Sequence, residues 1–423
     1  NRNASAIESL HAIGIAGHMH GATLLDKNGE ILHPCILWND TRSYKQASIL
    51  DKEENLREIT GNIVFPGFTA PKLLWIQDNK PELFEQVAKV LLPASYLGYY
   101  LTGEFFMDMS DAAGTSWLDV GNRCWSEYAL QASNMRSDQM PKLLEGTQVA
   151  SSVSKFIADE LGIPSGVSVV AGAGDNAAAA CGVGITKEGQ GFVSIGTSGV
   201  LLTARDTYTP LAQSAVHTFC HAIPKTWYQM GVILSATDSL NWLSSVTGKS
   251  PKELSEGLGH KINGPSFEKF YPYLSGERTP LNDAHIRGGF SGLSTNSNRM
   301  KLTQAVLEGV AFALCDCLEA LKKAGPCPDQ LLAIGGGSRS RFWLETIATT
   351  LNTAIARPID GEYGAAMGAA RLAILGKTSE HLNNIVSHPT ISEIIEPRTD
   401  LSDLYSEAFN LYKSAPSHLK SIQ

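Results

Sequence analysis

The centre of the chain reads Val169-Val-Ala-Gly-Ala-Gly-Asp-Asn-Ala-Ala-Ala-Ala-Cys-Gly-Val-Gly184, a run of small residues whose one charged side chain is Asp175. Gly172 and Gly174 precede this aspartate, and glycines let the backbone turn sharply and a ligand approach closely. A carboxylate in apolar surroundings is desolvated, which raises its pKa and suits it to act as a general base. The stretch therefore predicts a strand over 167–172 and a helix that presents Asp175 to a hydroxyl proton.

The same run is long enough to cross a membrane, which is the main structural alternative. Residues 167–185 are almost uncharged, and about 20 apolar residues span a bilayer. However, Asp175 and Asn176 would then lie at the bilayer centre, where a carboxylate is costly. We therefore reject a membrane helix at this position.

A second glycine-rich segment follows, Val193-Ser-Ile-Gly-Thr-Ser-Gly-Val200. Apolar residues on both sides of Gly196-Thr-Ser-Gly199 predict two short strands around a tight turn. The backbone N–H groups of Gly196 and its neighbours, with the hydroxyls of Thr197 and Ser198, can bind a phosphate without a lysine. Alone, such a turn is an ordinary hairpin, and its closeness in sequence to Asp175 is what favours a phosphate site.

Glycines also gather in Leu331-Leu-Ala-Ile-Gly-Gly-Gly-Ser-Arg-Ser340, where the pattern predicts a strand, a turn and a helix. The three glycines would stand at the helix N-terminus, a position that suits an anion or a nucleotide phosphate. Further on, 361–371 predicts a helix whose small residues permit close packing. We expect that helix to act as a scaffold beside the Gly335 loop.

Length and composition limit the number of domains and the class of ligand that we expect. A chain of 423 residues is too long for one ordinary core, so we expect two domains, residues 1–186 and 187–423. The last helix, near 402–413, is expected to pack back on the first domain. A net charge of -8 without a basic block argues against nucleic-acid and membrane partners. Small molecules are the expected ligands, and seven cysteines in no regular framework favour a reducing cytoplasm.

Apolar and helical patterns alternate along the chain, which predicts an α/β fold. Strands are expected at 10–16, 88–93, 167–172, 192–203, 215–222 and 228–234. Helices are expected at 43–59, 70–78, 81–89, 125–133, 236–247, 301–323 and 340–352.

Two pairs of side chains suggest a metal site that we reject. Cys315 and Cys317 are two residues apart on an expected helix and point in different directions, so we interpret them as packing thiols. His217 and His221 have a ligand spacing only if their segment is helical, and that segment reads equally well as a strand. No third ligand lies near them in the sequence.

Longer segments resemble the FGGY carbohydrate kinases. Gly67-Phe-Thr-Ala-Pro-Lys-Leu-Leu-Trp-Ile-Gln-Asp-Asn79 fits the first signature of that family at every constrained position. The second signature runs from Gly288-Gly-Phe-Ser-Gly-Leu through Ala305-Val-Leu-Glu308. It fits except that Lys301 stands where an acidic, amide or histidine side chain is usual. We expect Lys301 to lie at the exposed start of a helix. Three further segments are similar to the ketopentose kinases of the family: Gly17-His-Met-His-Gly21, Asp108-Met-Ser-Asp-Ala-Ala-Gly-Thr115 and Tyr273-Leu-Ser-Gly-Glu-Arg-Thr-Pro280.

The resemblance implies two actin-like, ribonuclease-H-like domains around a cleft, with ATP on one side and a ketopentose on the other. The implied reaction converts D-xylulose to D-xylulose 5-phosphate with ATP and Mg²⁺. By the same resemblance, Asp175 takes the proton of the sugar hydroxyl. The implied binding residues are Met19, His20 and Asn176 for the sugar, Gly196, Thr197 and Ser198 for the ATP phosphates, and Gly335, Gly336, Gly337 and Ser338 for the adenosine. The resemblance identifies no ligand for Mg²⁺ in this sequence.

Alternatives remain open at this point. Spacing alone favours a core histidine for His20, and the resemblance assigns it to the sugar. The substrate could instead be ribulose, gluconate or glycerol, and a non-catalytic sugar or nucleotide sensor is a different class. The family begins with an Asp-x-Gly-Thr phosphate motif that is not found before Asn1, so we expect the protein to contain residues that precede it. A homodimer is implied by the resemblance alone.

Overall fold

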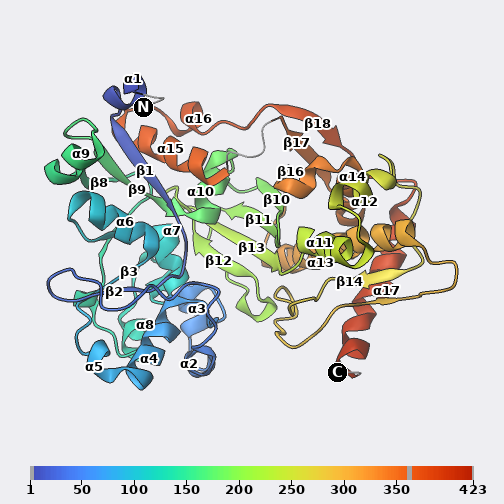
Figure 1. Ribbon diagram of the computed structural model, residues 1–423, viewed down its shortest axis with the longest axis horizontal. Coiled ribbons are helices and arrows are strands. Elements are labelled where there is room, and N and C mark those ends of the chain that lie inside the picture. The colour runs from blue at the N-terminus through green and yellow to red at the C-terminus, as the bar shows by residue number, and fades with distance from the viewer. Residues whose placement is uncertain (1–3, 360–363, 422–423) are drawn as a thin grey trace.

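The structure, a computed structural model, describes residues 4–359 and 364–421 of the chain. Helices and strands are mixed along its length, and each half of the chain builds a sheet (Figure 1). The two halves form two domains that lie side by side. This arrangement confirms the two-domain α/β fold that the sequence predicts.

The amino-terminal domain is built on a sheet with the order β1-β9-β8. Strand β1 (Ala12–Gly17) runs parallel to β9 (Ser168–Gly174), and β8 (Val149–Ser152) is antiparallel to β9. The register places Gly17 opposite Gly174. Because parallel strands end at the same edge of a sheet, the loop after β1 and the residue after β9 emerge next to each other.

Smaller elements complete this domain around two cores. Helices α6 (Pro93–Thr102) and α9 (Lys155–Leu161) cover the sheet. A separate core lies under α2 (Tyr44–Leu50), α3 (Leu56–Thr60), α4 (Thr69–Asn79), α5 (Pro81–Phe84) and α8 (Glu127–Ala132), with β2 (Thr23–Leu25) and β3 (Lys89–Leu91). The remaining short elements are α1 (Ala4–Glu8), β4 (Phe106–Asp108), α7 (Met109–Ala112), β5 (Leu118–Asp119), β6 (Cys124–Trp125) and β7 (Lys142–Leu144).

The second domain is built on a seven-stranded sheet with the order β12-β13-β11-β10-β16-β17-β18. Its strands are β10 (Gly191–Ile195), β11 (Gly199–Arg205), β12 (His217–Cys220), β13 (Trp227–Ile233), β16 (Gln330–Ile334), β17 (Ala354–Pro358) and β18 (Ile391–Ile395). Strands β10, β16 and β17 are parallel, and the other pairings are antiparallel. Strands β10 and β11 form the hairpin that the sequence predicts around Gly196-Thr-Ser-Gly199.

Helices cover one face of this sheet and bury the largest core of the molecule. They are α11 (Thr237–Thr247), α12 (Pro251–Gly257), α13 (Arg299–Ala324), α14 (Arg341–Leu351) and α17 (Ser402–Ser421), with a small ribbon of β14 (Lys269–Tyr271) and β15 (Gly289–Ser291) beside them. Lys301 is exposed in the first turn of α13, as expected. Cys315 and Cys317 are buried in the same helix as packing thiols.

The last helix does not pack on the first domain, so that expectation is wrong. Tyr405, Phe409 and Tyr412 of α17 are buried in the second domain, where the Tyr412 ring centroid lies 5.4 Å from that of Phe312 on α13. Their spacing places these side chains on one apolar stripe of the helix. The stripe fits α13 and α14, and α17 therefore lies on the far side of the molecule from β1 (Figure 1).

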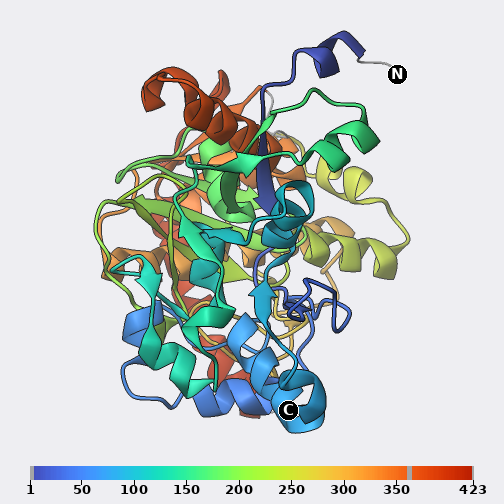
Figure 2. The same cartoon turned by 90° about the vertical axis from the view of Figure 1, so that its left-hand side faces the viewer.

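The helix that returns to the first domain is α15 (Gly364–Lys377), which packs against β1 and α10 (Asp175–Gly182) (Figure 2). Contact is backbone to backbone, since a Cβ on Gly368 would lie 1.8 Å from the carbonyl oxygen of Ala178. A Cβ on Gly14 would lie 2.0 Å from that of Ala369. The expected close packing is confirmed, but the expected place beside the Gly335 loop is wrong. Residues 361–363, the predicted start of this helix, lie outside the described residues.

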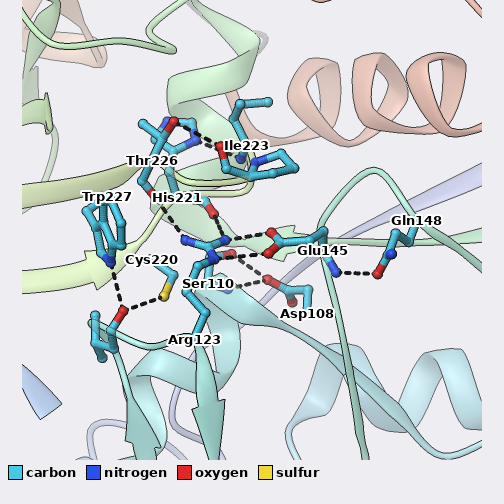
Figure 3. Close-up of polar contacts among 12 residues, drawn as sticks. Asp108, Ser110, Arg123, Glu145, Gln148, Cys220, His221, Ile223, Thr226 and Trp227 are labelled. Carbon is cyan, nitrogen blue, oxygen red and sulfur yellow. Dashed lines mark hydrogen bonds and ion pairs between the residues drawn. The ribbon is translucent and has the colours of Figure 1, made fainter. Parts of the chain in front are cut away.

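The second face of the large sheet packs on α10 and on the first domain, which joins the two domains through a shared core. Arg123 of the first domain adds polar contacts across the interface between the two domains (Figure 3). Its guanidinium pairs with Glu145 at 2.6 Å and donates to the carbonyl oxygens of Thr226 at 2.9 Å and His221 at 3.2 Å. Trp227 donates from Nε1 to the carbonyl oxygen of Val120 at 2.7 Å.

Some local expectations change in the structure. The helix expected over 43–59 is two short helices, because Asn55 takes a left-handed φ of 64° between them. The helix expected over 81–89 stops at Phe84, and its last residue belongs to β3. The uncharged run at 167–185 is a strand followed by a helix. Within the part of the chain that the structure describes, every helix is too short or too polar to cross a membrane.

We expect Gly368→Ala to destabilise the fold, because the new methyl group would collide with the backbone of α10. Overpacking of this kind costs about 1–3 kcal/mol, measurable by chemical unfolding. The matched control is Gly257→Ala in α12, where a Cβ meets no atom within 4 Å. The control should be neutral or slightly stabilising, and equal stability of the two variants would contradict the close packing.

Candidate active site

Four predicted site residues, Met19, His20, Asp175 and Asn176, lie at the carboxyl ends of β1 and β9. The loop after β1 carries the first pair, and the start of α10 carries the second. A Cβ on Gly174 would lie 3.1 Å from Cγ of Met19, so the two segments touch. Ligands of α/β folds bind at this edge of a sheet.

Asp175 is the first residue of α10 and is exposed. Asn176 donates twice to its Oδ1, from the backbone nitrogen at 2.7 Å and from Nδ2 at 3.0 Å. These bonds leave Oδ2 to receive a proton. Although the side chain is exposed, nearby protein atoms partly desolvate the carboxylate, and this desolvation raises the pKa of Asp175; the bonds from Asn176 and the charge of His18 act in the opposite direction.

Asp108 anchors the turn that carries Asp175. Its Oδ1 accepts hydrogen bonds from the backbone nitrogens of Ser110 at 2.9 Å and Asp111 at 3.0 Å, which caps α7. The hydroxyl of Ser110 also donates to Oδ1 of Asp108 (Figure 3). The same hydroxyl accepts a hydrogen bond at 2.9 Å from the backbone nitrogen of Gly174. The chain of bonds fixes the residue just before the candidate base.

Asp111 is a third acid beside the turn, and the sequence analysis did not assign it to the site. Both of its carboxylate oxygens are buried without a hydrogen-bond partner among the described residues. Burial raises the pKa of Asp111 well above its usual range, and the charges of Asp108 and Asp175 raise it further. The neutral acid is therefore favoured. Two acids in the otherwise uncharged 105–115 segment were the available signal.

The side chain of His20 is held by a hydrogen bond and by a stacked aromatic ring. Nδ1 donates to the carbonyl oxygen of Gly114 at 2.7 Å, and the ring stacks on Phe68 with centroids 4.4 Å apart. Burial lowers the pKa of His20 to about 3, opposed by the bond to Gly114 and assisted by the charges of Lys72 and Arg278. The ring is therefore neutral, and Nε2 presents a lone pair as a hydrogen-bond acceptor.

Met19 is buried, with 4% of its surface exposed. Its sulfur accepts a long hydrogen bond of 3.9 Å from the hydroxyl of Tyr228 on β13, so Met19 touches both domains. Burial raises the pKa of Tyr228 well above its usual range, with the charges of Asp175, Asp111 and Asp108 next in effect. Met19 thus forms an apolar wall next to the acidic side chains.

A cluster of rings continues from His20 into the second domain. Phe68 lies 6.1 Å from His217 of β12 between ring centroids, and the guanidinium of Arg278 lies 4.9 Å above the ring of Phe65. The Nδ1 of His217 bonds to Oδ1 of Asn62 at 2.8 Å. His217 lies on strand β12, so its segment is a strand and not a helix.

The hairpin between β10 and β11 exposes the predicted phosphate-binding residues. The side chains of Thr197 and Ser198 are exposed, and their hydroxyl groups have no hydrogen-bond partner among residues 4–359 and 364–421. The carbonyl oxygen of Gly196 accepts from the backbone nitrogen of Thr237 at 2.8 Å, and that of Thr197 accepts from Ala236 at 2.8 Å. The turn is thus fixed on the start of α11, while its hydroxyls stay open to a ligand.

The Gly335 loop lies against the same hairpin. Gly335 has a φ of 85°, which favours glycine, and a Cβ there would lie 2.8 Å from the carbonyl oxygen of Ile195. A Cβ on Gly337 would lie 2.3 Å from Cγ2 of Ile195. Ser338 donates from Oγ to the carbonyl oxygen of Gly335 at 2.6 Å. The structure therefore brings the two predicted nucleotide segments together at the ends of β10 and β16.

A cavity of about 640 Å³ opens beside this loop. Gly336 and Gly337 form one wall, and helices α11, α12 and α14 form the others. Asn241, Ser255 and His260 line the cavity and were missed from the sequence, because nothing in their local pattern marks them. A cavity of this size suits a ligand as large as a nucleoside.

Comparisons with known proteins agree with this arrangement. Residues 3–182 match the N-terminal domain of the FGGY family of carbohydrate kinases, and residues 191–376 match its C-terminal domain. The chain is 44% identical over 377 residues to the xylulose kinase of Escherichia coli (strain K12), which covers 89% of this chain and 78% of that protein.

Solved structures are similar over nearly the whole chain. One is described as a xyloylose kinase from Brucella ovis, with 52% identity, a TM-score of 0.95, and coverage of 98% of this chain and 85% of that one. A gluconate kinase from Lactobacillus acidophilus has 25% identity, a TM-score of 0.89, and coverage of 97% and 86%. Fold and site together define an ATP-dependent sugar kinase. The chain belongs to the FGGY family of carbohydrate kinases.

We expect the acid limb of kcat/KM to lie above the usual range of an aspartate, because Asp175 must be ionised to accept a proton and desolvation raises its pKa. Activity should therefore fall as the pH falls through this raised pKa.

Asp175→Asn should lower kcat by about 10²–10⁴-fold while the sugar still binds, as measured by steady-state kinetics and calorimetry. Asp138→Asn, at an exposed ion pair, should behave as wild type, and turnover retained by Asp175→Asn would exclude it as the base.

Gly336→Leu tests the nucleotide side. A Cβ at Gly336 meets no protein atom within 4 Å, so the new side chain should extend into the cavity without disturbing the fold. We expect a severalfold rise in the KM for ATP, with the KM for sugar and the midpoint of thermal unfolding unchanged. Gly289→Leu, equally uncrowded but outside the cavity, is the control. An unchanged KM for ATP would place the nucleotide elsewhere.

Proposed function

We propose that this chain transfers the terminal phosphoryl group of ATP to D-xylulose and forms D-xylulose 5-phosphate. The observation that carries the proposal is Asp175, a carboxylate with a raised pKa that opens α10 in a chain 44% identical to the E. coli xylulose kinase. Phosphoryl transfer depends mainly on positioning and on stabilisation of charge. The protein therefore has to align one hydroxyl with the phosphate and remove its proton.

Asp175 performs the proton transfer in this proposal. Asn176 occupies Oδ1 with two donors, so Oδ2 faces the substrate as the acceptor. The neutral ring of His20 accepts a hydrogen bond from a second sugar hydroxyl through Nε2, and Met19 closes the pocket as an apolar wall. The bonds from Asn176 keep the carboxylate in one orientation, which positions the attacking oxygen.

The nucleotide is placed by the other cluster. Gly196, Thr197 and Ser198 offer backbone N–H groups and two free hydroxyls to the phosphates, and the Gly335–Ser338 loop leads to the cavity for the nucleoside. Mg²⁺ would enter with the ATP phosphates and neutralise their charge. Among the residues that the structure describes, no three His, Cys, Asp or Glu side chains form a group that could hold a metal ion.

Another sugar is the second candidate. The gluconate kinase and a ligand-bound xylulose kinase, both from Lactobacillus acidophilus, are equally distant from this chain at 25% identity, with TM-scores of 0.89 and 0.90. Overall fold therefore does not choose between these substrates. The higher identity to xylulose kinases favours D-xylulose.

The direct test is ADP release in a coupled assay with ATP and Mg²⁺. D-xylulose should give the highest kcat/KM in a panel with ribulose, gluconate and glycerol. Omission of the sugar should leave only slow hydrolysis of ATP, and removal of Mg²⁺ with a chelator should abolish turnover. A higher kcat/KM for gluconate than for D-xylulose would show that gluconate is the substrate. Nucleotide binding without turnover of any sugar would support a non-catalytic sensor.

We also propose a cytoplasmic homodimer. The cysteines of the described chain are all free thiols, as a reducing compartment requires. The homodimer rests on the family resemblance, and light scattering of the purified protein would measure it.

A further inference from the structure

The backbone of His20 is held in an unfavourable conformation. Its φ is 70°, in the left-handed region that residues other than glycine rarely adopt. Such a conformation costs free energy and persists only where neighbouring groups enforce it. The groups that enforce it here come from a segment about 50 residues further along the chain.

Two side chains of α4 donate to the same atom, the carbonyl oxygen of His20. Nζ of Lys72 lies 2.8 Å from it, and Oγ1 of Thr69 lies 3.1 Å from it. The residue just before the helix, Phe68, supplies the ring on which the imidazole stacks. One turn of α4 therefore fixes both the peptide and the ring face of His20.

Lys72 is unusual as a structural residue. It is fully buried, with 0% of its surface exposed, and no ion pair of the described residues includes it. Burial lowers its pKa to about 7, with the charges of Cys35 and Asp40 in partial opposition. Burial of an ammonium group without a paired carboxylate costs free energy that an apolar side chain would avoid. Lys72 donates its hydrogen bond to the carbonyl oxygen of His20. A functional role at His20 therefore accounts for the burial of this ammonium group.

We propose that Lys72 and Thr69 are positioning residues for sugar binding that act through the carbonyl oxygen of His20. Their two hydrogen bonds hold the peptide in its left-handed conformation, which aims the imidazole at a sugar hydroxyl. Lys72 does not touch the sugar itself, because its side chain is covered. This inference rests on the proposed function, in which His20 contacts the sugar.

The test compares Lys72→Met, Thr69→Val and Thr69→Ser in the full-length protein by steady-state kinetics. Loss of this hydrogen bond leaves the carbonyl oxygen of His20 without one of its two donors, which should raise the KM for the sugar about 10- to 100-fold in Lys72→Met. Thr69→Val should raise it less, and Thr69→Ser, which keeps the hydroxyl, should restore the wild-type value. The KM for ATP should not change in any of them.

The control is Lys89→Met. Lys89 also donates to backbone carbonyl oxygens, those of Asp138 at 2.6 Å and Met140 at 3.3 Å, but in another part of the same domain. Its loss should affect stability without raising the KM for the sugar. If Lys89→Met raises that KM as much as Lys72→Met, the effect is general destabilisation and the proposal fails.

A double-mutant cycle with His20→Ala shows whether Lys72 acts through His20. Lys72→Met should add little to the rise in KM caused by His20→Ala. Independent effects of the two substitutions would overturn the proposal, as would an unchanged KM in His20→Ala. If Lys72→Met does not fold, the Thr69→Val and Thr69→Ser pair in the same cycle decides.

A crystal structure of Lys72→Met separates this inference from the proposed function. If the wild-type enzyme phosphorylates no sugar in the panel, the proposed function fails, and the conformation of His20 in this variant still decides the positioning role. A shift of His20 out of the left-handed region supports it. An unchanged φ and an unchanged stack on Phe68 would overturn it.

Discussion

The close contact of three backbones, those of β1, α10 and α15, is the constraint on which the rest of the structure depends. Glycines and alanines let these segments approach until a single methyl group would collide with a carbonyl oxygen, as at Gly368 and Gly14. Such contact leaves α10 no freedom to slide or tilt. The candidate base at the first turn of α10 therefore has a fixed position relative to the loop after β1, which carries His20.

Local sequence patterns predicted those features that depend on neighbouring residues. The strand and helix around Asp175, and the hairpin at Gly196, followed from glycines placed between apolar runs. The conformation of His20 could not be predicted in this way, because the donors that enforce it come from α4. The other walls of the cavity beside the Gly335 loop were missed for a similar reason, since three separate helices, α11, α12 and α14, supply them.

The sequence predicted the wrong packing partner for both α15 and α17, which shows a further limit of sequence patterns. An apolar stripe such as that of Tyr405 and Tyr412 tells that a helix is packed on one side. It does not tell which of two domains provides the partner. That choice depends on the shapes of both surfaces, and the small residues of α15 fit α10, whereas the aromatic residues of α17 fit α13.

The return of α15 has a consequence for the order in which the chain folds during synthesis. Helix α10 ends at Gly182, but the helix that covers it ends at Lys377. The ribosome must add roughly 195 residues between them, which takes roughly 10–40 s at typical rates of translation. During that interval the small-residue face of α10 is without its partner. The first domain therefore reaches its final packing only after most of the second domain has been made.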